Sequence, residues 1–284
     1  MQLPREEWVE QAYLYRVLLE RIGRDVSLQD LLLNVKHELL ATTKLPMAID
    51  FLLAELKHVG VMAEGMRRIG HYFTSFQSFV VAESERDRGR FDFRMALQIL
   101  HKEAAYRAEN SNPQGVFFYQ FESLSRNRLT YDTGLKAMSD DPIYNEDWKQ
   151  WILVVRRELG IVELADLIYG RSEDFVAYRK RRLGPDAKAE LPILFGEKEG
   201  KISLANRRKD PLYLFAAMQR HLGYPAVPRP ERIDNTHEMI PQMQRRLERL
   251  EHRLKLLEEE NREGIDITRF YNPKAAAPDD IEQI

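Results

Sequence analysis

Residues 61–80 read VMAEGMRRIGHYFTSFQSFV, and this stretch decides the fold class. Its large apolar side chains recur at intervals of 4, 3, 4, 3 and 4 residues. They are Met62, Met66, Ile69, Phe73, Phe76 and Val80. This spacing places them on one face of an α-helix. We predict one continuous helix of about six turns at the centre of a helical bundle.

Helical spacing of apolar residues continues on both sides of this stretch. It extends over residues 4–22, 27–40 and 46–56 before it, and over 93–106, 148–159 and 172–182 after it. Start signals accompany several of these segments, such as Ser27 followed by Asp30, and Pro46 at a first turn. The sequence therefore predicts an all-α, bundle-like domain over residues 1–183.

The pattern changes after Gly184 and Pro185. Two apolar runs, 191–195 and 201–204, flank GEKEG at 196–200, which is compatible with a small β-hairpin or with an irregular loop. A helix is predicted to begin at Asp210-Pro211. We predict a small mixed extension over 184–223, a Pro-rich connector over 224–236, a coiled coil over 237–262 and a mostly flexible tail over 263–284.

The predicted coiled coil depends on a narrow apolar stripe. Its members fall at intervals of 3, 4, 3, 4 and 3 residues, and most of the positions between them are polar. They are Ile240, Met243, Leu247, Leu250, Leu254 and Leu257. A stripe this narrow is typical of a coiled-coil seam rather than of the wider face of a globular helix.

The charges beside the stripe favour a parallel pairing. With the leucines at a and d, the g positions carry Arg246 and Arg253, and the e positions carry Glu251 and Glu258. In a parallel dimer these arginines face glutamates, whereas an antiparallel pairing centred here brings like charges together. Asn261, at the next a position, also favours two parallel strands. We predict that the coil joins two copies of this chain or joins the chain to another protein. The remaining alternative is a helix that packs back on its own domain or stands alone as a solvated charged helix.

Composition limits the function classes. The chain has 284 residues, 44% hydrophobic and 31% charged, with a net charge of −2 and no cysteine. The lack of cysteine excludes disulfides, thiolate metal sites and Fe–S clusters. We find no apolar stretch of membrane-spanning length and no signal-peptide pattern after Met1, and therefore expect a cytoplasmic protein without a membrane span.

Candidate catalytic and metal-binding residues form no recognisable motif. Glu55 and His58 have the Glu-x-x-His spacing of di-iron bundles, but a second copy is missing, so we predict no metal and no cofactor. The segment 60–65 lacks the Lys-Ser/Thr pair of a P-loop. In an alternative interpretation, the protein is an enzyme that uses His71 or Glu64 in a cavity of the bundle.

The sequence favours a non-enzymatic scaffold or adaptor that assembles through its coiled coil and presents the helical domain to a protein partner. Two alternatives accompany this prediction. A pocket lined by at least two ionisable residues would favour the enzyme. A nucleic-acid-binding regulator, which we do not favour, would require the basic clusters 179–182 and 207–209 to share one face.

Overall fold

The computed structural model describes residues 3–23, 26–86, 91–109, 111–184 and 191–229, together with Leu250, Glu251 and Leu254. Contacts divide the chain into two units, Met1–Pro230 and Glu231–Ile284. The described residues of the first unit form thirteen helices, with isolated β-bridges and no strand. The predicted all-α class is therefore confirmed. None of the helices in the described ranges is long and apolar enough to cross a bilayer.

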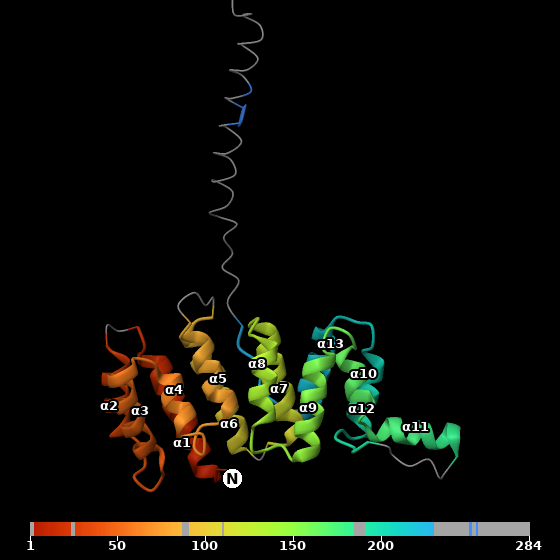
Figure 1. Cartoon of the computed structure of the whole chain (residues 1–284), viewed down its shortest axis with the longest axis horizontal. Coiled ribbons are helices and arrows are strands. Elements are labelled where there is room, and N and C mark those ends of the chain that lie inside the picture. Colours follow the sequence, from red (N-terminus) through yellow and green to blue (C-terminus); the bar gives the residue numbers. More distant parts are fainter. Residues whose placement is uncertain are drawn as a thin grey trace, which may run out of the picture. The chain divides into compact units, whose positions relative to one another are not determined.

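The helices of the first unit pack in two rows (Figure 1). In one row, successive neighbours are α3 (Leu45–Val59), α4 (Met62–Arg68), α5 (Ser75–Ser84), α8 (Tyr131–Ser139) and α9 (Glu146–Glu158). In the other, they are α2 (Leu28–Lys36), α1 (Arg5–Arg21), α6 (Phe93–Ala108), α7 (Pro113–Arg126), α13 (Pro211–Leu222), α12 (Glu197–Ala205) and α10 (Leu164–Tyr169). Helix α11 (Glu173–Leu183) packs on α12 and projects from the rows (Figure 1).

The core lies where the apolar faces of the two rows meet. Aromatic side chains dominate the part of the core around α7, α9 and α13. The Phe117 and Trp151 rings, from α7 and α9, have centroids 4.8 Å apart. Phe118 of α7 stacks on Tyr224, beyond the end of α13, at 6.3 Å. Burying an aromatic of this size stabilises the fold by about 1.5–3 kcal/mol. Packing of this kind therefore holds α7, α9 and the segment after α13 together.

The helix starts that we predicted from capping residues are confirmed. The Ser27 hydroxyl accepts a hydrogen bond from the Asp30 amide at the start of α2, at 3.1 Å. The Asp210 carboxylate accepts one from the Leu212 amide at the start of α13, at 2.8 Å. Each bond satisfies an amide that a helix leaves without an internal partner.

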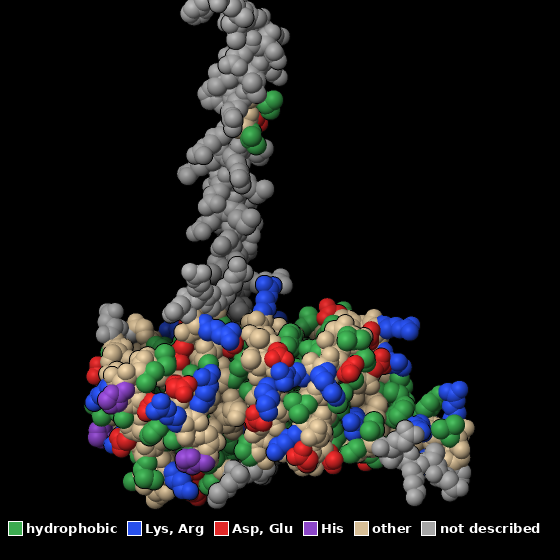
Figure 2. All heavy atoms as spheres, in the orientation of Figure 1, with side chains coloured by type: hydrophobic (Ala, Val, Ile, Leu, Met, Phe, Trp, Pro, Cys, Tyr) green, Lys and Arg blue, Asp and Glu red, His purple; other side chains and the backbone are tan. Residues whose placement is uncertain are grey.

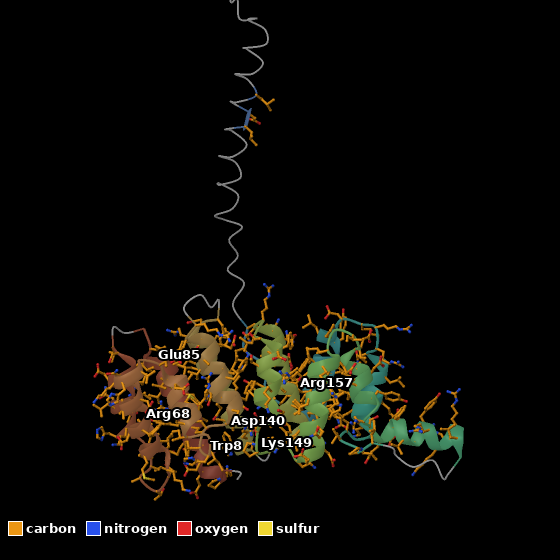
Figure 3. The ribbon with its side chains drawn as sticks, in the orientation of Figure 1. Trp8, Arg68, Glu85, Asp140, Lys149 and Arg157 are labelled. Atoms are coloured by element: carbon orange, nitrogen blue, oxygen red, sulfur yellow. The ribbon has the colours of Figure 1, made fainter. Side chains whose placement is uncertain are left out.

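The single long helix predicted over residues 62–80 is wrong. The stripe begins in α4 and ends in α5, and Ile69 and Phe73 lie in the turn between the two helices. Its members are nevertheless buried, with Ile69 partly so. Thr74 and Gln77 form a capping box that starts α5, so the chain begins a second helix there. The Glu85 carboxylate accepts hydrogen bonds from the Met62 and Ala63 amides, at 2.6 and 3.0 Å, and so caps the start of α4. Figure 3 labels Glu85.

The β-hairpin considered for residues 191–204 is also corrected, because the structure places α12 at Glu197–Ala205. Gly196 is its N-cap, and acidic residues in the first turn suit the positive end of the helix dipole. Gly200 lies inside the helix, where an added Cβ would overlap the Ser172 side chain. The glycines that resemble turn residues in the sequence therefore serve a helix cap and a close helix contact.

Residues 224–229, the first part of the predicted connector, lie against α6 and α7. The Tyr224 hydroxyl donates to Glu122 Oε2 at 2.7 Å, and Asn127 Nδ2 donates to the Pro228 carbonyl at 3.1 Å. Lys102 Nζ donates to the Ala226 carbonyl at 2.8 Å. The domain boundaries that we drew at 183, 223, 236 and 262 stay predictions.

Candidate functional site

Only a small part of the predicted coiled coil belongs to the described residues. Leu250, Glu251 and Leu254 are helical, and the two leucines are 53% and 58% exposed. Because they are four residues apart, they lie on the same helix face. The other predicted oligomerisation residues lie outside the described residues: Ile240, Met243, Arg246, Leu247, Arg253, Leu257 and Glu258. The coil and its pairing stay predictions.

A cavity of about 310 Å³ lies beside the N-terminal part of α1. The turns between α4 and α5, α6 and α7, and α8 and α9 complete its wall. Its lining includes Arg5, Trp8, His71, Thr74, Arg107 and Asp141. Trp8 belongs to α1 and is labelled in Figure 3, near the end of α8 where Asp140 is labelled. Because four of these six side chains are ionisable, the cavity meets the condition that favours the enzyme alternative.

A buried ion cluster adjoins this cavity. The Arg107 guanidinium donates to Glu103 Oε1 from Nε at 3.1 Å and from Nη2 at 2.8 Å. It also donates to both oxygens of Asp141, with 3.2 Å from Nη1 to Oδ1. The arginine side chain is 5% exposed and both carboxylates are fully buried. Its guanidinium carbon lies 4.8 Å from the centroid of the Trp8 ring, within cation–π range.

Neighbouring polar groups complete the cluster. Gln120 Nε2 donates hydrogen bonds to Glu103 Oε1 at 2.8 Å and to Asp141 Oδ2 at 3.2 Å. The side-chain oxygen of Gln120 accepts a hydrogen bond from the Tyr144 hydroxyl at 3.1 Å. The Ile143 amide donates to Asp141 Oδ1 at 3.1 Å. Helices α6 and α7 and the turn after α8 are thus joined by hydrogen bonds at one buried point.

Burial controls the protonation of this cluster. Removal from water raises the pKa of Glu103; the charge of Arg107 opposes this shift and that of Asp141 adds to it. Burial alone would lower the pKa of Arg107, but its two carboxylate neighbours raise it above its usual value. Glu103 Oε2 and the Tyr15 hydroxyl are buried, and neither has a hydrogen-bond partner among the residues that the structure describes. The arginine therefore stays charged, while Glu103 favours its neutral form more than a free glutamate does.

A second cavity of about 440 Å³ shares Gly70 with the first. Charged side chains around it pair with one another near the surface. Arg156 donates to both oxygens of Asp132, at 2.6 and 2.8 Å, and Lys136 donates to Asp140 at 3.0 Å. Water screens such exposed pairs, so the two members of each pair interact more weakly than the buried side chains of the ion cluster do.

The structure separates most of the sequence candidates. His71 lines the first cavity, whereas Glu64 pairs with Arg67 at 3.1 Å on the surface of α4. Glu55 pairs with Arg68 at 2.9 Å, and His58 is exposed. The described residues contain no group of three or more His, Asp or Glu side chains that could hold a metal ion. The absence of a metal in the protein stays a prediction.

The two basic clusters make separate contacts. Arg207 pairs with Asp166 of α10, whereas Arg181 and Arg182 bond within α11 to the Ala177 carbonyl and the Tyr178 hydroxyl. On the face seen in Figure 2, acidic and basic side chains are interspersed. Arg181 and Arg207 nevertheless both act electrostatically on Tyr169, so one residue of each cluster lies near it. The shared basic face that the nucleic-acid alternative requires stays a prediction.

Sequence reasoning missed Arg107 and Asp141. Glu103 and Arg107 lie on the apolar face of α6, which also carries Leu100 and Ala104, and charged residues at core positions are a usable signal. Asp141 has no such signal, because it follows α8 and reaches the cluster through the tertiary fold. No family model matches the chain, and no curated protein or solved structure matches it.

Proposed function

We propose that this protein is a non-enzymatic adaptor that assembles through its C-terminal segment and presents its helical unit to a protein partner. The observation that carries the proposal is the exposure of Leu250 and Leu254, which share one helix face and are each more than half exposed. Large apolar side chains at this spacing are buried when a second helix packs against them.

Leucine burial dominates the energy of such an assembly. Fully burying a leucine contributes about 1.5–3 kcal/mol, whereas an exposed ion pair contributes about 0.2–1 kcal/mol. The predicted pairs of Arg246 with Glu251 and of Arg253 with Glu258 would therefore select orientation and partner more than they add affinity. Loss of the two leucines should abolish assembly.

The helical unit offers a partner an accessible helix. Helix α11 projects from the rows (Figure 1), and Asp174 is its only buried residue. Its first turn is acidic and its last turn is basic. Tyr178 is 43% exposed and Leu183 is 65% exposed, so α11 presents both charge and apolar surface. Accessible surface of both kinds is typical of protein-binding helices.

The cavity supports a second candidate function, an enzyme with its site in the helical unit. Arg5, His71, Arg107 and Asp141 all line it. However, both Asp141 oxygens bind Arg107, and His71 forms no hydrogen bond within the described ranges. A general base held by an orienting partner is thus missing from this lining, which favours ligand binding over catalysis.

The adaptor proposal is tested by the mass of the full chain in solution. We expect light scattering to give at least a dimer for the unaltered chain and a monomer for Leu250→Lys with Leu254→Lys. The matched control is Leu204→Lys with Leu212→Lys, which changes two leucines of the helical unit that are 40% and 47% exposed. The control should keep the oligomeric mass.

A chain ending at Pro230, the limit of the first unit, provides the second comparison. It should be a monomer with the helical circular dichroism of the intact unit. An oligomer of unchanged size would place the interface in the helical unit and defeat the proposal. A monomeric intact chain at tens of micromolar would instead require a different protein as the partner of the coil.

A further inference from the structure

The first cavity has more hydrogen-bond donors than acceptors among its charged and buried polar side chains. Asp141 is the carboxylate of its lining, and its two oxygens already accept four hydrogen bonds, from Arg107 twice, Gln120 and the Ile143 amide. A carboxylate has about four lone-pair sites, so Asp141 has no capacity left for a ligand.

Arg107 has one donor to spare. A guanidinium carries five N–H groups, and the four hydrogen bonds of Arg107 use Nε–H, both Nη2 hydrogens and one Nη1 hydrogen. The second Nη1 hydrogen has no partner within the described residues. Because the side chain is 5% exposed and lines the cavity, bulk water gives this donor little compensation.

Two further side chains offer donors to the same space. The Thr74 hydroxyl oxygen accepts a hydrogen bond from the Gln77 amide, but the hydroxyl hydrogen has no acceptor among the described residues. Thr74 is only 5% exposed. Arg5 uses Nε to bind the Ala108 carbonyl at 2.9 Å, and in the described part of the chain its terminal nitrogens bind nothing. The cavity thus combines a buried cation, a buried hydroxyl and an exposed cation.

The rest of the wall is partly apolar. Trp8 is 8% exposed, and Pro113 and Ile143 contribute aliphatic surface. A ligand that fills such a site needs an acceptor at one end and an apolar body at the other.

We propose that this cavity binds a small organic acid. Its carboxylate accepts hydrogen bonds from Arg107 Nη1, the Thr74 hydroxyl and Arg5, and its apolar body lies against Trp8. Arg5, Arg107 and Asp141 give the lining a charge of +1, before His71 and the deeper Glu103 are counted. One negative charge matches this better than a phosphate monoester, which carries about −1.5 to −2 at neutral pH. The lining residues all belong to the first unit, and none is part of the C-terminal assembly segment, so this inference does not depend on the adaptor proposal.

The test uses the full chain and three probes of similar size, benzoate, benzyl alcohol and phenyl phosphate. By calorimetry we expect benzoate to bind with a Kd of about 0.1–5 mM, the range typical of a ligand this small. Phenyl phosphate should bind more weakly, and benzyl alcohol at least about tenfold more weakly, because it leaves the donors without a charged partner. In nuclear magnetic resonance spectra, benzoate should shift the Arg107 side-chain signals.

Matched variants locate the binding. Arg5→Gln should weaken benzoate binding about three- to tenfold, since it removes an exposed cation from the rim. Arg67→Gln removes a comparably exposed cation that lines the neighbouring cavity, and it should leave the Kd unchanged. Equal binding of benzyl alcohol and benzoate would overturn the proposal, as would equal effects of the two variants. Tighter binding of phenyl phosphate than of benzoate would overturn the assignment of a carboxylate. No heat and no Arg107 shift at about 50 mM, roughly ten times the upper limit of the expected Kd, would exclude the site.

Discussion

Two groups of charged side chains flank Gly70, and they differ in exposure more than in chemistry. On one side, Arg107, Glu103 and Asp141 are almost completely shielded from water. On the other, Lys136 and Asp140 are about half exposed, at 52% and 47%. Both groups contain hydrogen-bonded ion pairs, yet water screens only the second. The comparison shows why counting ion pairs says little about stability.

The buried group is costly to form and costlier to break. Two carboxylates and one guanidinium have left water, and their mutual attraction, their hydrogen bonds and the contact of Arg107 with the Trp8 ring compensate for this. Removing the single cation would leave two acids in the core without a counter-charge. The exposed group lacks this vulnerability, because water solvates whatever a substitution leaves behind.

The largest effect should follow from breaking the buried group. We expect Arg107→Ala to lower the free energy of unfolding by about 3–5 kcal/mol, because Glu103 and Asp141 lose their cation. Urea unfolding followed by circular dichroism measures this. Arg67→Ala is the matched control, since Arg67 is 55% exposed and pairs with Glu64, which is 41% exposed. It should cost less than about 1 kcal/mol. Equal losses for the two variants would mean that burial does not distinguish the groups.

The same contrast explains which parts of the molecule could be predicted from sequence. Ser27 and Asp210 act on amides within three residues, so their helix starts were readable. The break between α4 and α5 could have been predicted, because Thr74 and Gln77 have the spacing of a capping box. We predicted one helix because the apolar residues continue at helical spacing across the break. Gly200 looked like a turn residue, and only its packing against Ser172 explains it.

The candidate site depends on longer-range contacts. Trp8, Arg107 and Asp141 come from three distant segments, and the spacing within any one of them does not reveal the cavity. His71 and Glu64 were named as alternatives for an enzyme site in a cavity; His71 lines the first cavity, whereas Glu64 pairs with Arg67 on the surface. The predicted coil, by contrast, follows from local heptads, and it falls mostly outside the described residues.

A smaller effect should appear in the pH dependence of stability. The pKa of Glu103 is raised in the folded protein, by burial first and by Asp141 second. Between the ordinary glutamate pKa of 4.5 and the raised value, the folded protein holds a proton that the unfolded chain releases. The resulting stabilisation is complete below pH 4.5 and is lost as pH rises through this window, by at most about 1.4 kcal/mol per pH unit.

Glu103→Gln should remove this component. As the pH rises from 4.5 to 8, the unaltered protein loses this stabilisation and the variant does not. The free energy of unfolding of the variant minus that of the unaltered protein should therefore increase over this range. Urea titrations of both proteins at several pH values measure the difference, in which the other ionisable groups largely cancel. Parallel pH profiles would show that Glu103 is ionised alike in the folded and unfolded states.

The smallest effect should come from the exposed group. Lys136→Gln removes an i, i+4 ion pair with Asp140, and we expect a loss of about 0.2–0.5 kcal/mol at low ionic strength. Because the Debye length shrinks to about 3 Å at 1 M salt, that loss should vanish there. The Arg107→Ala loss should largely persist, because the Glu103 and Asp141 carboxylates that it leaves without a cation are fully buried, where dissolved ions screen charge little. Lys149→Gln is the control, because Lys149, labelled in Figure 3, forms no ion pair among the described residues. A Lys136→Gln loss that survives high salt would mean that the exposed pair behaves like the buried one, and the distinction between the two groups would fail.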